Sequence, residues 1–248
     1  FRSEQLQLEV EDIGKASPEK HAEYGFDLSK LIPSTKHNVN QMWRALAKII
    51  KDMQNKHLKS LISSIYKENA DVIKQHPASM KLHHAWLGGF LEHVLSMAKL
   101  GVHLGKHYDV DGDLLLTGIL LHDIGKIVEL NPAQQPGYTD EGQLLGHIVL
   151  GRDIARDAIS QIDDFPKELQ LKVEHMILSH QGKYEWQSPK RPKFKEALLL
   201  HHIDELDARM NMMEEVLEKD GEPGAWTNRF NYFRIPLLKG DLEDDEDV

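Results

Sequence analysis

The sequence contains no cysteine and no long hydrophobic run, and both absences limit what the protein can be. Without cysteine there is neither a disulfide framework nor a thiolate metal site, so any metal must bind through histidine and carboxylate groups. No stretch of about 18 apolar residues occurs, and the N-terminus does not show the charged and then apolar pattern of a secretory signal. We therefore expect a cytoplasmic protein that does not enter a membrane.

Negative charge predominates, but it is distributed unevenly. The formal net charge is −10, and six acids without a base lie in the last eight residues, DLEDDEDV; we expect residues 236–248 to form an acidic, disordered tail. In contrast, residues 183–195 hold five Lys or Arg and three aromatic residues with a single acid. Because a local basic stripe can bind phosphates on an otherwise acidic surface, the net charge does not exclude a nucleic acid as partner.

Strand patterns are almost absent. Residues 5–10, QLQLEV, alternate polar and apolar, and because a lone strand is not stable, we interpret residues 1–13 as the remnant of a β domain that is otherwise missing. The chain opens on Phe1 rather than Met, which suggests that further residues precede it. Residues 14–38 contain Pro, Gly and mixed charge without periodicity, which is typical of a linker. A helical pattern then continues over residues 39–235.

This region is predicted to form an irregular all-α bundle. Residues 114–121, LLLTGILL, are apolar on all sides and should form the buried central helix, with Asp113 as its N-cap. The last predicted helix, residues 194–219, carries an apolar stripe at helical spacing and should be half buried along its length. The stripe consists of Leu200, Ile203, Leu206, Met210, Met213 and Leu217. The other predicted helices span residues 40–50, 57–66, 84–100, 143–159 and 168–178.

A His-Asp pair, His122 and Asp123, stands where the most apolar helix ends. Burying both groups without partners would cost several kcal/mol, and a divalent metal would supply the partner. Imidazole nitrogen and carboxylate oxygen suit Zn, Mn, Fe and similar ions, and one carboxylate can bridge two of them. Further donors of this kind lie beside apolar runs at intervals of one helix plus a connection, so a bundle could bring them together. These donors are His93, His147, His180 and Asp204.

The order of these donors, with Gly125 and Lys126 after the pair, resembles the HD-domain metal-dependent phosphohydrolases over about residues 80–215. The resemblance implies two divalent metal ions, with Asp123 bridging them. It implies that the first is held by His93, His122, Asp123 and Asp204, and the second by Asp123, His147 and His180.

Four longer segments are similar to the YhaM-type bacterial 3′-5′ exoribonucleases, which join an N-terminal OB-fold to an HD domain. They are HHAWLGGFLEHVLSMAKL, YTDEGQLLGHIVLG, HMILSHQGKYEWQSPKRP and EALLLHHIDELDARMNMM. On this resemblance, residues 1–13 would be the last strand of an OB-fold and residues 39–235 the HD domain. Gln181 departs from the pattern, because a further histidine often stands there.

The resemblance implies a phosphodiesterase that hydrolyses single-stranded RNA, or less favourably DNA, from the 3′ end. Two ions about 3.5–4 Å apart would activate water and stabilise charge on the scissile phosphate. Asp123 and Lys126 are the predicted catalytic residues, with Lys126 reaching a phosphate oxygen or the leaving group. Gly125 would let the backbone turn. Manganese is favoured as the metal, with Fe, Co, Mg, Zn and Ni as alternatives because first-row ions compete for His/Asp sites.

Substrate contacts are predicted mainly in the basic stretch, where lysines could follow a polyanion and aromatic rings could stack on bases. The predicted residues are His84, Lys183, Tyr184, Trp186, Lys190 and Arg191. The competing interpretation is a solvated loop bounded by prolines and a structural histidine. Two other functions stay open: a nucleotide or cyclic-nucleotide phosphohydrolase in signalling, and a metal-stabilised RNA-binding module without activity. The sequence leaves the oligomeric state open as well.

Overall fold

A computed structural model describes residues 14, 18–24, 33–79, 84–131 and 137–240, and the chain divides into two units, residues 1–33 and 34–248. In the first unit, the described residues form the short helix α1 (Pro18–His21) and the 3-10 turn η1 (Ala22–Tyr24). The strand predicted at residues 5–10 lies outside the described residues. Within the described part of the chain, every helix is too short or too polar to cross a membrane.

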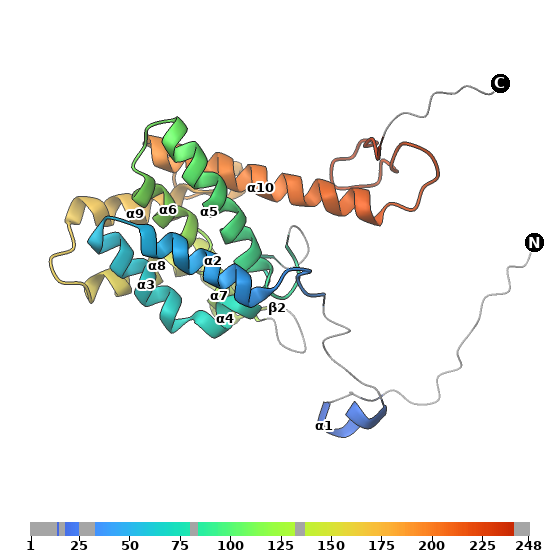
Figure 1. Cartoon of the computed structure of the whole chain (residues 1–248), viewed down its shortest axis with the longest axis horizontal. Helices are drawn as coiled ribbons and strands as arrows, with labels where there is room; N and C mark the ends of the chain where they lie inside the picture. The colour runs from blue at the N-terminus through green and yellow to red at the C-terminus, as the bar shows by residue number, and fades with distance from the viewer. Residues whose placement is uncertain (1–13, 15–17, 25–32, 80–83, 132–136, 241–248) are drawn as a thin grey trace, which may run out of the picture. The chain divides into compact units, whose positions relative to one another are not determined.

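The second unit is a bundle of helices, which confirms the predicted all-α class (Figure 1). A small antiparallel sheet pairs β1 (Leu130–Asn131) with β2 (Gly137–Tyr138), and η3 (Tyr184–Trp186) is a 3-10 turn. The helices of this unit are α2 (Val39–Asp52), α3 (Lys56–Glu68), α4 (Ala70–Gln75), α5 (Gly89–His107), α6 (Gly112–Leu121), α7 (Lys126–Glu129), α8 (Asp140–Ser160), α9 (Lys167–Ser179) and α10 (Lys195–Lys219).

The predicted central helix is confirmed. Every residue of α6 from Leu114 to Leu121 is buried, and the helix packs against α3, α5, α9 and α10. The predicted cap was wrong, because Asp111 rather than Asp113 accepts a hydrogen bond from the backbone N–H of Leu114, at 3.0 Å. The Oδ2 of Asp113 instead accepts the backbone N–H groups of Gln54 and Asn55, at 2.7 and 2.5 Å. Asp113 thus fixes α6 to the connection before α3.

The apolar stripe predicted on the last helix is buried only in its first part. Leu200 and Ile203 lie in the core, whereas Leu206 is 47% exposed and Met210 51% exposed, so the prediction of burial was wrong for these two residues. The reason is the length of α10, whose second half runs past the end of the bundle (Figure 1). Its apolar face therefore continues where there are few helices to cover it.

The chain after α10 folds back on itself. Trp226 and Leu238 form an antiparallel bridge, and the Nζ of Lys239 lies 2.9 Å from the Oδ2 of Asp220 at the end of α10. Residues 236–240, which the sequence placed in the acidic tail, take part in this fold, while residues 241–248 lie outside the described residues. At the other end of this unit, Thr35 from the predicted linker donates its backbone N–H to the carbonyl oxygen of Leu87, at 2.9 Å.

Two glycines shape the contact between α7 and α8. A Cβ on Gly125 would lie 2.0 Å from the carbonyl oxygen of His147, so only glycine allows this approach. The backbone turns over residues 122–125, as predicted, but Gly125 has an ordinary helical φ of −63°, so the close approach rather than the turn requires a glycine there. Gly146 interrupts α8 with φ 73° and ψ 156°, where a side chain would be strained. The break frees the next N–H, and His147 donates it to the Oε1 of Glu129 at 2.9 Å.

Candidate metal centre

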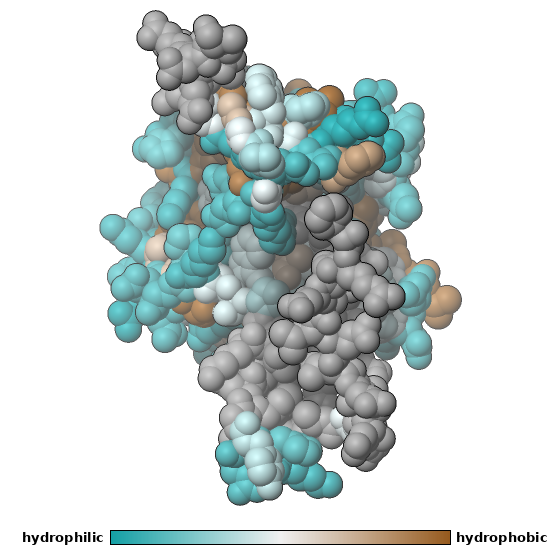
Figure 2. Space-filling model, turned by 90° about the vertical axis from the view of Figure 1, so that its right-hand side faces the viewer, coloured by the Kyte–Doolittle hydropathy of each residue, from teal (hydrophilic) through white to brown (hydrophobic). Residues whose placement is uncertain are grey.

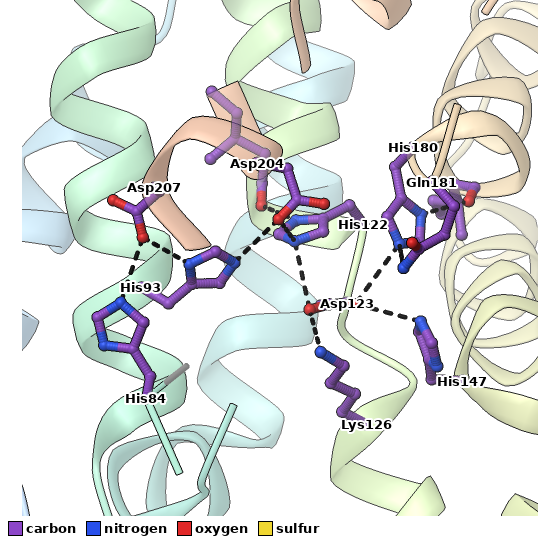
Figure 3. A network of polar contacts seen from close by, with 12 residues as sticks. His84, His93, His122, Asp123, Lys126, His147, His180, Gln181, Asp204 and Asp207 are labelled. Carbon is purple, nitrogen blue, oxygen red and sulfur yellow. Dashed lines mark hydrogen bonds and ion pairs between the residues drawn. The ribbon is translucent and has the colours of Figure 1, made fainter. Parts of the chain in front are cut away.

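The six predicted metal ligands meet in the interior of the helical unit (Figure 3). His93 lies in α5 and Asp204 in α10, while His122 and Asp123 follow the C-terminal end of α6. Their packed helices bring these four residues together although more than 100 positions separate the first from the last. The remaining two come from neighbouring helices, as His147 follows the break in α8 and His180 caps α9.

Three of these residues form one candidate ion site. The Oδ1 of Asp204 lies 3.4 Å from the Nε2 of His93 and 3.8 Å from the Nε2 of His122. The three ligand atoms all lie within 4.8 Å of one another. This spacing leaves room for a single cation between them.

A second candidate site adjoins the first, and Asp123 faces both. Its Oδ1 lies 3.4 Å from the Nε2 of His147 and 3.6 Å from the Nε2 of His180. Its Oδ2 lies 3.4 Å from the Nε2 of His122, which belongs to the first group. Asp123 thus directs one oxygen to each group, the arrangement that a carboxylate bridging two ions requires.

The other nitrogen of each histidine has a protein partner. Because carbonyl and carboxylate oxygens only accept hydrogen bonds, each Nδ1 carries a proton and each Nε2 is the nitrogen presented to the centre. The four pairs are His93 with Asp207 at 2.8 Å, His122 with the Ile119 carbonyl at 2.8 Å, His147 with Glu129 at 3.1 Å and His180 with the Ile177 carbonyl at 2.8 Å.

Several inward-facing atoms are buried without a hydrogen bond among the described residues: the Nε2 of His122, the Nε2 of His147 and the Oδ1 of Asp123. Buried polar atoms of this kind are costly, and neutral imidazole with carboxylate is a donor set that first-row divalent ions bind. The residues present therefore fit the metal ions that the sequence implies.

The charged groups of the centre shift one another's pKa values. Burial alone would raise the pKa of Asp123, but Lys126, whose Nζ lies 2.6 Å from its Oδ2, and His122 hold that pKa well below its usual range. Burial followed by the neighbouring His122 lowers the pKa of His180 to about 4, so this imidazole is neutral. Burial would also lower the pKa of His93, yet Asp204 and Asp207 raise it to about 9, so an ion binding there must displace a proton.

A cavity of about 260 Å³ opens onto the centre. Asp123, Lys126, His180 and Asp204 line it together with three larger side chains from further along the chain, Trp186, Arg209 and Tyr232. Glu205 orients Arg209. The Nε–H of Arg209 donates to the Oε1 of Glu205 at 3.0 Å, and the Nη2 of Arg209 lies 2.8 Å from the same oxygen. Carboxylates, a buried ammonium, a guanidinium and aromatic rings thus surround one small volume.

The predicted substrate contacts divide into two groups. Trp186 lines the cavity, and the Nζ of Lys183 lies 4.1 Å from the centroid of its ring. Tyr184, Lys190 and Arg191 are exposed nearby in sequence, but they do not line the cavity.

His84 is placed elsewhere. It is buried behind His93, where its Nε2 lies 3.2 Å from the Oδ2 of Asp207, and it lines a different cavity of about 940 Å³ beside α2, α5 and α10. The structure therefore connects His84 with the support of a ligand rather than with the cavity at the metal centre.

Sequence reasoning missed the acids that hold the histidines. Asp207 accepts hydrogen bonds from His93, His84 and Ser96, and its position one helical turn after Asp204 was a usable signal. Glu129 had no such signal, because it reaches His147 only through the packing of α7 on α8.

Gln181 stands where the family pattern often has a further histidine, and its Nε2 lies 3.2 Å from the Nε2 of His180. The amide of Gln181 thus lies beside the second candidate ion site.

Comparison with known proteins identifies the family. The model of the HD domain matches residues 90–209, which contain all six candidate ligands. A second family model, with a helicase description, matches residues 33–111, which contain His93 alone of the six. No solved structure matches the chain significantly.

Three curated bacterial proteins are similar over most of the chain, and each is named 3′-5′ exoribonuclease YhaM. The Bacillus subtilis protein is 38% identical over 226 residues, which cover 90% of this chain and 69% of that protein. The Shouchella clausii protein gives the same figures. The Bacillus licheniformis protein is 42% identical over 193 residues, 77% of this chain and 60% of its own length. The chain therefore belongs to the family of the YhaM 3′-5′ exoribonucleases and carries their HD domain.

Proposed function

We propose that this chain hydrolyses the phosphodiester bonds of single-stranded RNA from the 3′ end, with two divalent metal ions. The observation that carries the proposal is Asp123, which directs its two carboxylate oxygens to two different groups of histidines at the wall of a cavity. The names of the relatives support RNA as the substrate and the 3′ end as the point of attack.

The candidate ligands divide between two ions. His93, His122 and Asp204 would hold one, His147 and His180 the other, and Asp123 would contact both. When bound, divalent ions act as Lewis acids that stabilise negative charge on the attacking and leaving oxygens of a phosphodiester. Manganese is the metal that we favour, and Fe, Co, Mg, Zn and Ni ions suit the same donors.

Lys126 supplies a fixed positive charge beside the reacting phosphate. It is 9% exposed, lines the cavity and has a pKa that Asp123 raises although burial opposes this, so it stays protonated. In that state it can donate to a phosphate oxygen or to the departing oxygen of the leaving nucleotide.

The wall of the cavity offers contacts for a nucleotide. Arg209, held by Glu205, can bind a second phosphate oxygen, and the ring of Trp186, which is 38% exposed, can stack on a base. Stacking of this kind does not distinguish one base from another, which suits an enzyme that removes every nucleotide in turn. We propose Lys183, Tyr184, Lys190 and Arg191 as outer contacts to the same strand.

The test uses single-stranded RNA labelled at its 5′ end, with Mn²⁺ added. We expect a ladder of products that shorten from the 3′ end, and a circular RNA of the same sequence should resist because it has no end. Asp123→Asn should lose this activity, whereas Asp157→Asn, an exposed acid on α8, should keep it.

Four results would contradict the proposal. Full activity of Asp123→Asn would exclude the mechanism, and cleavage of the circular RNA would exclude attack from the end. Turnover of mononucleotides or cyclic nucleotides without turnover of RNA would favour a signalling phosphohydrolase instead. Binding of RNA without cleavage at any metal concentration would indicate a binding module.

A further inference from the structure

Residues 225–240, in the segment after α10, form a loop with several internal hydrogen bonds, which we name the C-terminal hook. The backbone N–H of Thr227 donates to the carbonyl oxygen of Leu237, and that of Lys239 to the carbonyl oxygen of Ala225, both at 2.8 Å. The side-chain amide of Asn231 donates to the carbonyl oxygen of Ile235 at 2.7 Å, and Thr227 and Leu237 are buried. The conformation of the hook is therefore fixed by its own hydrogen bonds.

This ordered loop nevertheless exposes large hydrophobic side chains. Phe230 is 84% exposed, and four others are exposed by between 43% and 55%: Trp226, Tyr232, Ile235 and Leu238. Single exposed hydrophobic residues are ordinary on a protein surface, but five large ones within 13 residues form a cluster. Such a cluster on a loop is typical of a binding surface.

Positive charge lies between these rings. Residues 225–240 contain Arg229, Arg234 and Lys239 and no acid, in a chain whose net charge is −10. Both arginines are exposed, and the Cζ of Arg229 lies 5.3 Å from the centroid of the Phe230 ring. Figure 2 looks at this end of the molecule and shows pale and brown residues among teal ones. Alternating aromatic and cationic groups are what single-stranded nucleic acids require for stacking and phosphate contact.

The hook reaches the cavity at the candidate metal centre, because its residue Tyr232 lines that cavity. A second cavity, of about 330 Å³, lies between the end of α10 and the hook, and it shares Met212 and Tyr232 with the cavity at the metal centre. Two acids line this second cavity, but Glu215 is paired with Lys219 and Asp220 with Lys239. The path from the metal centre to the hook therefore carries little unpaired negative charge.

We propose that the C-terminal hook binds the single-stranded RNA just upstream of its 3′-terminal nucleotide and guides the strand into the metal centre. Phe230 and Tyr232 would stack on successive bases, while Arg229 and Arg234 would contact the phosphates between them. The proposal rests on the proposed function for its substrate. A second copy of the chain is the competing occupant of this surface, and the arginines and the two adjoining cavities favour RNA over it.

The test compares the double variant Phe230→Ala/Arg229→Gln with a matched control, Tyr108→Ala/Arg44→Gln. The control removes an aromatic residue that is 56% exposed and an exposed arginine, neither of which lies in the hook or lines the two cavities. Binding is measured by fluorescence anisotropy with a 10-nucleotide RNA whose 3′ linkages are phosphorothioates. Hydrolysis of bis(p-nitrophenyl) phosphate, which is too small to span both cavities, reports the metal centre alone.

We expect the hook variant to bind the 10-mer about fivefold or more weakly than the control, because one stacked base and one phosphate contact are lost. The RNA affinity of the hook variant should also depend less steeply on salt concentration, by about the amount that one phosphate contact contributes. Its kcat/KM for RNA should fall in parallel, while hydrolysis of the small phosphodiester stays unchanged.

Equal RNA affinity in the hook and control variants would overturn the inference, and so would a wild-type chain that binds no RNA. A shift in sedimentation velocity with unchanged RNA affinity would overturn it in favour of self-association. RNA bound through the hook but never cleaved would contradict the proposed function and leave this inference standing. RNA cleaved equally well by both variants would contradict the inference alone.

Discussion

The Oδ2 of Asp207 lies 2.8 Å from the Nδ1 of His93. Asp204, one helical turn before Asp207, faces the other nitrogen of the same ring. Two carboxylates of α10 thus hold one imidazole from both sides. Burial alone would raise the pKa of Asp207, but hydrogen bonds from His84 and His93 lower it, so it stays an acceptor. Partners of this kind fix the orientation of a metal-binding histidine.

Asp207→Asn should therefore weaken metal binding without removing a ligand. An amide accepts more weakly than a carboxylate, and the loss of such a partner typically lowers metal affinity about 10- to 100-fold. Calorimetric titration with Mn²⁺ measures the change, with Asp157→Asn as the control. Unchanged affinity would show that Asp207 serves the packing of α10 alone.

Glu129→Ala should act on the other candidate ion. The Oε1 of Glu129 accepts hydrogen bonds from both the backbone N–H and the Nδ1–H of His147, and His147 belongs to the second group of candidate ligands. We expect the bound metal, measured by mass spectrometry of the native protein, to fall from two ions per chain toward one. Equal loss of both ions would contradict the division of the ligands into two groups.

Lys126→Met should destabilise the protein in EDTA more than in excess Mn²⁺. Removing the ammonium leaves the buried Asp123 carboxylate uncompensated, and breaking a buried pair in this way costs about 3–5 kcal/mol. A bound ion would compensate the same carboxylate. Urea unfolding under both conditions measures the difference, and the double variant with Asp123→Asn should recover stability in EDTA. An equal loss with and without the ion would contradict this account.

Gly125→Ala should lower both stability and metal content. The new Cβ would lie 2.0 Å from the carbonyl oxygen of His147 and 2.5 Å from the backbone nitrogen of Gly151, so α7 and α8 must separate. Overpacking of this kind costs about 1–3 kcal/mol. Gly112→Ala is the matched control, because a Cβ there would meet no side chain or backbone outside its own turn of helix within 4 Å. Equal melting temperatures in the two variants would show that the contact is not tight.

The sequence was sufficient to predict the central helix, because an apolar run is a local pattern. It also pointed to the six candidate ligands that the structure brings together, because their order along the chain resembles that of a known family. It was not sufficient for the cap of α6. Asp111 and Asp113 flank one glycine and are equally suited as caps; what decides between them is the binding of Asp113 to Gln54 and Asn55, 58 to 59 positions away. Such a choice depends on tertiary contacts that no local pattern contains.

The residues that line the cavity at the metal centre could not all be predicted from the sequence either. Trp186 reaches the cavity and His84 does not, although both stand close in sequence to a candidate ligand, because the direction of a side chain depends on how its segment is packed. Tyr232 could not be found from the sequence, since it enters the cavity only through the return of the hook onto α10. The exposed Leu206 and Met210 likewise follow from a helix that is longer than the bundle.

The hydrogen bonds on the outer nitrogens of the four histidines have a consequence for the supply of ions. Two of them go to carbonyl groups one turn back in the same helix segment, at Ile119 and Ile177, and two go to the carboxylates of Asp207 and Glu129. The chelating face is thus preorganised by the polypeptide, and ions can exchange without local refolding. We expect one folded chain to accept different divalent ions in turn, with the abundance of each ion in the cell setting the working form of the enzyme.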